Sequence, residues 1–277
     1  MTTQTRTTRS TVVVATAIVG GLALTGAGAS WALAAVQDVA SGPTTGSATA
    51  DGTGLAGLDL DIGGAKVTVE FGDVAEPRLT TSGPAAERWT IRRDDGDLVV
   101  KSPRRYFGFG DGLCLPWCFD DRNAREAVLT LPRALDGGAL DADISLGAGS
   151  VHVFGGFDDL DVEIGAGDAR VDGGARTFSL SIGAGDAEIA LADVEDADFD
   201  IASGRAGVEL TGAAPSNVDI EVSVGELDIA LPNVPYRVDS RVTMGDLRNE
   251  LRVDPTSSRQ VRVEVSVGDV ALRAGAR

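Results

Sequence analysis

Acidic side chains recur directly after glycine in the last two-thirds of the chain. They are Asp168, Asp186, Glu226, Asp246 and Asp269. If the repeats stack, these carboxylates would line up, and calcium ions prefer several oxygen ligands at once. Calcium-binding nonapeptide repeats place Asp every nine residues, whereas the spacing here is 18 or more, and Ser150 and Arg205 interrupt the column. Because Asp and Gly are also favoured in turns, we expect turn residues, with Asp168 and Asp186 as the calcium candidates.

The irregular segment at residues 102–126 is a second candidate, because it interrupts the repeats and concentrates aromatic residues. Its candidate contact residues are Tyr106, Phe107, Phe109, Trp117 and Phe119. Aromatic side chains on a loop bury a large area with little loss of entropy, which suits a recognition surface. The alternative is that they cover a sheet and hide its open backbone groups. The two roles can coexist.

Cys114 and Cys118 are the only cysteines in the chain and stand in the segment Cys-Leu-Pro-Trp-Cys. In an oxidising compartment this pair predicts one disulfide that closes a tight loop. A metal site would need further ligands, and the single histidine, His152, lies far along the chain. We therefore expect neither a metal site at the cysteines nor a cofactor.

Sequence patterns typical of catalysis are absent from this chain. It has no Gly-x-Ser-x-Gly elbow, no phosphate-binding Gly-x-x-x-x-Gly-Lys loop and no His-Glu-x-x-His motif. A Ser-His-Asp arrangement could use only His152, whose flanking residues read as a strand. With 42 acidic residues, carboxylate pairs occur by chance and cannot nominate a glycosidase. A polysaccharide-active β-helix is the remaining enzyme alternative, and we expect no enzyme.

Short alternating strands joined by a glycine corner must position all these residues. Two clear copies, residues 162–171 and 180–189, share the segment Ile-Gly-Ala-Gly-Asp-Ala. The corner glycines are spaced 18 to 23 residues apart, at Gly149, Gly167, Gly185, Gly204, Gly225, Gly245 and Gly268. This period predicts an all-β fold, a single-stranded parallel β-solenoid of about ten coils. Hairpins in an antiparallel sandwich are the alternative, because Gly and Asp also suit hairpin turns.

The N-terminus predicts export. Residues 1–10 carry Arg6 and Arg9 and no acid, and residues 11–36 carry no charge, which is long enough for a transmembrane helix. The arginines orient residues 1–10 toward the cytoplasm and the bulk of the chain outside, as a single-pass protein of the cell membrane. A signal peptide cleaved at the small residues 27–29, which would release a secreted protein, is the alternative.

Beyond the apolar segment, residues 37–56 are rich in Gly, Ser, Thr and Ala and predict a flexible linker. The repeat domain follows at residues 57–277. The net charge of −18 excludes a nucleic-acid partner, since phosphate contacts need a basic surface. It also disfavours contact with anionic lipid headgroups. We therefore expect membrane contact through the N-terminal helix only.

The strands that end in [Ile/Val]-x-x-Gly-[Asp/Ser/Glu]-x-x-[Val/Ile/Leu], repeated behind a membrane segment, resemble a bacterial family. This family is known as the "putative adhesin" family, a domain of unknown function with β-strand repeats, and the resemblance covers residues 55–272. It implies a right-handed β-helix at the cell surface, without catalytic residues. We expect a non-catalytic binding module whose partner is an envelope protein or a wall polymer. A structural rod that self-associates, and an ectodomain that regulates an envelope-stress partner, are the alternatives.

Overall fold

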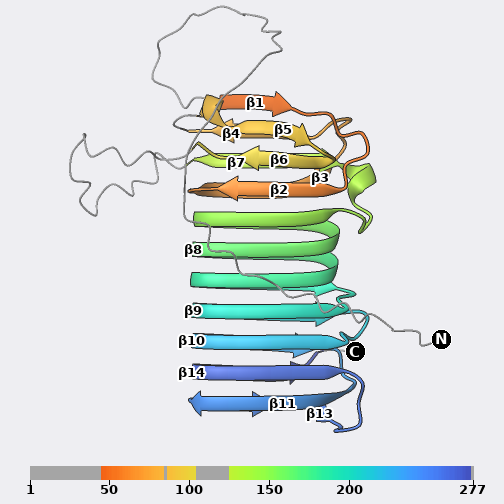
Figure 1. The fold of residues 1–277 in the computed structure, drawn as a ribbon, viewed down its shortest axis with the longest axis vertical. Helices are drawn as coiled ribbons and strands as arrows, with labels where there is room; N and C mark the ends of the chain where they lie inside the picture. Colours follow the sequence, from red (N-terminus) through yellow and green to blue (C-terminus); the bar gives the residue numbers. More distant parts are fainter. Residues whose placement is uncertain (1–44, 84–85, 104–124, 276–277) are drawn as a thin grey trace, which may run out of the picture. The chain divides into compact units, whose positions relative to one another are not determined.

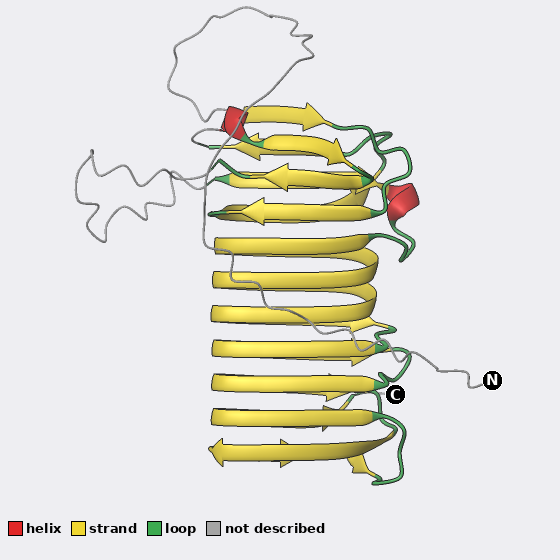
Figure 2. Cartoon of the chain, viewed as in Figure 1, coloured by secondary structure: helices red, strands yellow, loops and turns green. Residues whose placement is uncertain are grey.

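The structure is a computed structural model that describes residues 45–83, 86–103 and 125–275. The chain divides into residues 1–41 and residues 42–277, and the described part lies entirely in the second unit. Within it, strands dominate, and the helical elements are the short 3-10 turns η1 (Ala86–Arg88) and η4 (Arg133–Leu135) (Figure 2). The prediction of an all-β fold is confirmed.

Parallel strands lie in register through the middle of the unit (Figure 1). They are β8 (Asp141–Ala192), β9 (Asp196–Thr211), β10 (Asn217–Leu231) and β14 (Gln260–Ala274). The β8–β9 ladder aligns Gly185 with Gly204, the next ladder aligns Gly204 with Gly225, and the β10–β14 ladder aligns Gly225 with Gly268. The repeated corners of the sequence therefore stack on one another.

The corner glycines are required by both backbone conformation and space. Gly167 has φ 134°, a region that side-chain-bearing residues rarely adopt. A Cβ atom on Gly167 would lie 1.9 Å from the carbonyl oxygen of Gly149, and one on Gly185 would lie 1.8 Å from that of Gly167. The same contacts show that β8 stacks on itself every 18 residues. The corners are tight because each backbone rests directly on the one beneath it.

The core is one continuous cluster built from alternate residues of every stacked strand. Period-two alternation places one set of side chains inward and the next outward. Phe178 of β8 and Phe199 of β9 are almost completely buried and meet at a ring-centroid distance of 5.8 Å. Outward positions in the same strands carry mainly polar and small residues, which leaves these faces hydrated.

The last strand of the chain lies inside the stack instead of ending it. β14 pairs with β10 on one side and with β11 (Pro235–Met244) and β12 (Leu247–Asn249) on the other (Figure 1). β13 (Arg252–Val253) pairs with the start of β11. Val261, Val263 and Val265 make β14 fully apolar on its inner face, whereas β11 has Ser240 at the matching place. Burial therefore favours β14 in the interior and β11 at the end.

At the opposite end of the strand order, strands that are distant in the sequence also pair with each other. β2 (Gly57–Ile62) and β3 (Ala65–Gly72) contact β8, while β6 (Asp97–Lys101) pairs with β2 and β7 (Glu126–Pro132) pairs with β3. Antiparallel strands follow on the outside, namely β5 (Thr90–Asp94), β4 (Arg78–Ser82) and β1 (Thr45–Thr49). This end is thus closed by antiparallel pairing that the repeat pattern did not predict.

The strand β1 corrects the prediction of a flexible linker at residues 37–56. Five residues of that segment, Thr45–Thr49, form an antiparallel ladder with β4. Small polar residues lack the apolar alternation that identifies a strand, yet their backbone groups bond to an edge as well as any others. The repeat region begins at Gly57, where the apolar pattern starts.

Several predictions from the sequence fall outside the described residues. They concern the transmembrane or signal helix at residues 11–36, the aromatic residues Tyr106, Phe107, Phe109, Trp117 and Phe119, and the pair Cys114 and Cys118. Within residues 45–83, 86–103 and 125–275, no helix has both the length and the apolar character needed to cross a bilayer.

Candidate interaction surfaces

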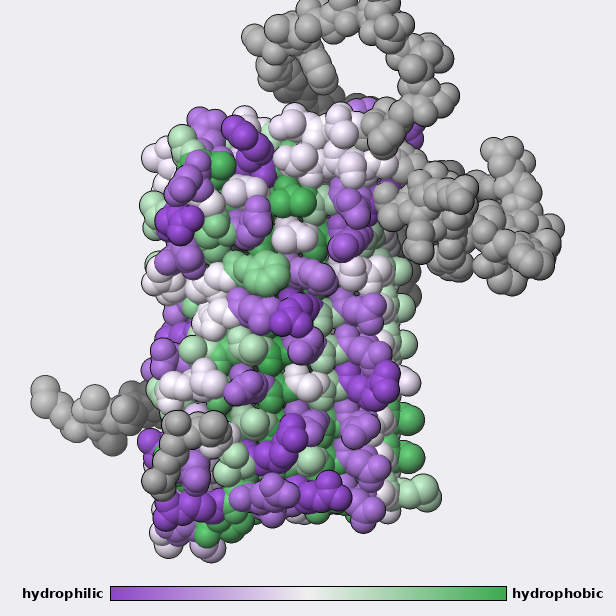
Figure 3. Space-filling model, turned by 180° about the vertical axis from the view of Figure 1, so that it is seen from behind, coloured by the Kyte–Doolittle hydropathy of each residue, from purple (hydrophilic) through white to green (hydrophobic). Residues whose placement is uncertain are grey.

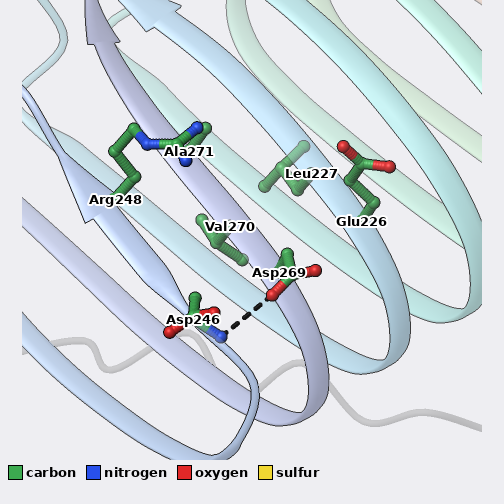
Figure 4. A pocket seen from close by; sticks show the side chains of 7 residues that line it. All are labelled: Glu226, Leu227, Asp246, Arg248, Asp269, Val270 and Ala271. Carbon is green, nitrogen blue, oxygen red and sulfur yellow. Dashed lines mark hydrogen bonds between the residues drawn. The ribbon is translucent and has the colours of Figure 1, made fainter.

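The turn acids form a column at the glycine corners, as their spacing predicted, and two of them, Asp186 and Asp269, accept hydrogen bonds from neighbouring residues of the column. Arg205 donates two hydrogen bonds to Asp186, both of 3.1 Å, and these bonds hold the pKa of Asp186 below its usual range. The backbone N–H of Asp246 donates to the Asp269 carboxylate over 2.9 Å (Figure 4). Asp246 and Asp269 line a shallow hollow together with Glu226 and Arg248.

Calcium binding at this column is not supported by its geometry. Among the residues that the structure describes, no group of three or more His, Cys, Asp or Glu side chains is arranged to hold a metal ion. Asp168 and Asp186, the calcium candidates, belong to this part. Arg205 stands in the column next to Asp186 and supplies the positive charge that a cation would bring.

A larger set of carboxylates covers one outer face of the stacked sheet, which we call the acidic face. Its members are Asp59, Asp61, Asp143, Asp161, Glu163, Asp198, Asp200, Asp219 and Glu221. Asp59 lies opposite Asp143 across the β2–β8 ladder, and Asp198 lies opposite Asp219 across the β9–β10 ladder. Strands in a sheet are about 4.8 Å apart, so these like charges are close neighbours.

Cations border the acidic face on two sides. Arg262 of β14 bonds to Asp219 over 2.7 Å, and Lys101 of β6 lies 3.7 Å from Asp61. Between these bridges, Ser179 separates Asp161 from Asp198 and bonds to Asp161, and the remaining carboxylates adjoin one another along the ladders. The sequence showed the individual Asp residues but not this face, since the repeat length varies and only the ladder registers reveal which acids are neighbours.

Crowding on the acidic face raises the pKa values of Asp143, Asp161 and Asp198. Loss of hydration between neighbouring strands is the largest cause for all three. Repulsion adds to it, from Asp59 on Asp143, from Asp143 on Asp161 and from Asp219 on Asp198. These side chains are exposed, so water weakens the repulsion without abolishing it.

Neutralising the acidic face should stabilise the fold at neutral pH. A raised folded-state pKa means that the folded protein binds more protons than the unfolded chain, so stability rises as pH falls through the raised pKa toward 3.8. The triple variant Asp143→Asn, Asp161→Asn and Asp198→Asn should therefore gain a few tenths of a kcal/mol per site at pH 7. This gain should shrink toward pH 4. Urea unfolding at both pH values measures it.

Asp158→Asn provides a control of opposite sign for this experiment. The Arg176 guanidinium bonds to Asp158 and holds the pKa of that carboxyl below its usual range. A depressed pKa contributes stability above the ordinary value, and this contribution disappears as pH falls through the depressed value. The variant should thus lose stability at pH 7. If the triple variant also lost stability there, repulsion on the acidic face would be disproved.

His152 lies on a strand and has no catalytic arrangement among the described residues. It pairs with Thr68 across the β3–β8 ladder, and its ring meets the edge of Phe154 at a centroid distance of 6.5 Å. Phe154 is itself 38% exposed. This geometry agrees with the strand position predicted from the flanking residues.

An apolar margin runs beside the glycine corners near the β11 end. Val224, Val267 and Met244 occupy matching positions in β10, β14 and β11, each directly before a corner glycine. They are 52%, 43% and 64% exposed, and apolar side chains gather along this margin in Figure 3. This margin becomes apparent only from the ladder registers, although an apolar residue directly before a corner glycine is its signal in the sequence. Exposed apolar side chains that adjoin one another are typical of contact sites.

Comparisons with known proteins find similarity among solved structures. No family model and no curated protein sequence matches this chain. The crystal structure of a "putative cell adhesion protein" from Clostridium sporogenes ATCC 15579 is similar, with a TM-score of 0.35 and 10% identity, over 84% of this chain and 100% of that one. A "putative adhesin" from Bacteroides fragilis NCTC 9343 gives a TM-score of 0.39 and 11% identity, over 84% of this chain and 98% of that one.

Proposed function

We propose that this chain is an exported, membrane-attached β-solenoid that acts as a non-catalytic, adhesin-like interaction module. The observation that carries the proposal is the parallel, in-register stacking of β8, β9, β10 and β14, with aligned corner glycines. Such a stack forms coils whose outward side chains repeat at the strand spacing of about 4.8 Å. It offers broad surfaces for contact with a large partner.

Membrane attachment in this proposal rests on the uncharged segment at residues 11–36, with Arg6 and Arg9 before it. The repeat domain would then stand outside the cell. Its acidic face selects against nucleic acids and anionic lipids and suits a neutral or cationic partner. An envelope protein or a wall polymer has the required location. No proposed step needs a metal or a cofactor.

The contact surface that we propose is the aromatic segment at residues 102–126. A variant with Tyr106, Phe107, Phe109 and Trp117 changed to Ser should lose its partner, because large aromatic anchors supply most of the energy in many interfaces. The measurement is a pull-down from solubilised cell envelopes, with the full-length chain in mild detergent as bait. The native chain should retain one protein or wall polymer that the variant does not.

Phe154→Ser is the matched control for the aromatic variant. It removes an exposed aromatic side chain that lies on β8, outside the segment. It should retain the same partner as the native chain, and all three proteins should show the same β-type circular dichroism. Equal retention by the native chain and the aromatic variant would refute the proposed contact surface. A retained signalling protein would instead favour a regulatory ectodomain.

A further inference from the structure

β11 forms an open edge at the end of the strand order. Its inner side pairs with β14 from Arg237 to Met244, while β13 covers its outer side only at Pro235 and Tyr236. Among the described residues, nothing pairs with the outer side of β11 beyond Tyr236. An open strand edge of this length is a template for pairing with another strand.

The start of β11 is held firmly, so the edge is presented in a fixed shape. Tyr236 is completely buried, and its hydroxyl donates a 3.1 Å hydrogen bond to the Pro232 carbonyl oxygen. Burial raises the pKa of Tyr236 to about 12. On the other side of the same residue, the Asp254 N–H donates to the Tyr236 carbonyl oxygen over 2.8 Å.

The backbone polarity of β11 defines which groups remain open. The Arg237 N–H donates inward to the Arg259 carbonyl oxygen, whereas the Tyr236 carbonyl oxygen accepts from the outer side. Alternate residues of a strand direct their backbone groups to opposite sides. Val238, Ser240 and Val242 therefore direct their N–H and C=O groups toward the open edge.

The charges of β11 match those of its own antiparallel copy. In a pairing centred on Ser240, residues whose numbers sum to 480 stand opposite each other. Asp239 then faces Arg241 of the second copy, and Val238 faces Val242. The open backbone groups of Val238, Ser240 and Val242 fall at hydrogen-bonded pairs in this register, and Asp239 and Arg241 at the closer non-bonded pairs.

The two nearest registers lack this match, and the next one, centred on Val238, needs the edge at Tyr236 that β13 already covers. A pairing centred on Asp239 places Asp239 against itself and Arg237 against Arg241, and one centred on Arg241 places Arg241 against itself. Like charges directly opposite destabilise a strand pair. Arg241 is available for the new contact, because its ion pair with Glu264 is long, at 3.8 Å, and exposed.

We propose that β11 is a homophilic contact site, at which two copies of this chain pair edge to edge around Ser240. The partner at this edge is a second copy of the chain, because Asp239 of each copy lies opposite Arg241 of the other. A two-fold axis therefore forms this opposite-charge contact twice. A head-to-tail contact with the opposite end does not offer this two-fold charge match, since Arg92 and Arg93 of the outer strand β5 are already in ion pairs with Asp94 and Asp51. The pairing also shields Val238 and Val242, which are half-buried in the single chain.

The proposed pairing gives the adhesin-like function a specific partner, and in this respect it rests on the proposed function. β1, which follows the N-terminal segments, lies at the end of the strand order opposite to β11. Two copies joined at β11 would therefore carry their β1 strands at the far ends of the pair. If the segment that precedes each β1 is held in a different membrane, the pair connects two apposed membranes.

Charge reversal with rescue tests the pairing. Arg241→Asp and Asp239→Arg each place like charges opposite each other, and the double variant restores opposite charges. The full-length chain in mild detergent should shift from monomer to dimer between roughly 10 µM and 1 mM in light scattering, the range of a small interface. Each single variant should bind at least about tenfold more weakly, and the double variant should return to within about threefold of native.

Ser240→Pro is a second test that leaves the inner ladder intact. Its N–H faces the open edge, so proline removes a donor that only the second copy would use. The variant should stay monomeric with unchanged circular dichroism. A native chain that is monomeric at 1 mM, single variants that dimerise like the native chain, or growth beyond dimers would each overturn the proposal.

Vesicle tethering separates this proposal from the proposed function. Full-length chain reconstituted in phosphatidylcholine vesicles should aggregate them, and Ser240→Pro should not. Dimers in detergent that obey the charge-reversal pattern without vesicle aggregation would support the β11 contact and count against the membrane placement. Aggregation by Ser240→Pro equal to that by the native chain would overturn the β11 contact.

Discussion

Gly167→Ala is expected to lower the free energy of unfolding by about 3–5 kcal/mol, among the largest effects of a single methyl group. The first cause is the φ of 134°, which is strained for any residue with a Cβ atom. The second is the 1.9 Å approach of that atom to the carbonyl oxygen of Gly149. This oxygen belongs to the backbone of the coil beneath, so it cannot move aside alone. Urea unfolding followed by circular dichroism measures the loss.

Gly207→Ala is the matched control. Gly207 lies in β9, and a Cβ atom there would meet no atom within 4 Å. Alanine restricts the unfolded chain more than glycine does, so this variant should be neutral or more stable by up to about 1 kcal/mol. Similar stabilities for the two variants would mean that the coils do not rest on each other at the glycine corner.

Phe199→Ala is expected to cost about 3–5 kcal/mol, because it empties a large volume in the middle of the core. Phe199 is 1% exposed and packs edge-on against Phe178, at an interplanar angle of 62°. Stacked backbones on both sides limit how far the cavity can collapse. Thermal and urea unfolding of the purified variant measure the change.

Phe154→Ala makes the same chemical change on the outer face and serves as the control. Its side chain is 38% exposed and contacts the ring of His152. We expect a loss of less than about 1 kcal/mol, as is usual for surface substitutions. A loss at Phe154 as large as that at Phe199 would contradict the division into an inner and an outer face.

The alternation of the strands and the position of the corners could be predicted from the sequence. Side chains alternate between the two faces of any strand, so runs such as Val261-Arg-Val-Glu-Val265 identify both the strand and its buried side. Glycines at near-constant spacing, five of them directly before an acid, identified the corners, and all seven of these glycines have positive φ. These features are local, and local residues are sufficient to specify them.

Function-bearing surfaces were less accessible to sequence reasoning. The turn acids were placed correctly in one column, but the bond between Arg205 and Asp186 shows that an interruption in the column can be a partner. The acidic face and the apolar margin depend on registers such as Asp198 opposite Asp219, and repeat lengths that vary from 18 to 23 residues conceal them. The aromatic segment stays a prediction.

The order of the strands at both ends was decided by the tertiary structure alone. Backbone hydrogen bonds do not depend on side-chain identity. The backbone ladder alone would therefore allow β14 to lie next to β10 or to lie beyond β11 at the end of the stack. The connection from β10 to β14, residues 232–259, costs little more entropy to close than a shorter one would. What selects the order is burial, because the buried residues of β14 are all valine or leucine, whereas β11 has the exposed Ser240 at the position that matches Val263. The sequence by itself thus determined the repeating strands and their glycine corners, and the competition for buried positions between distant strands determined which strand ends the stack.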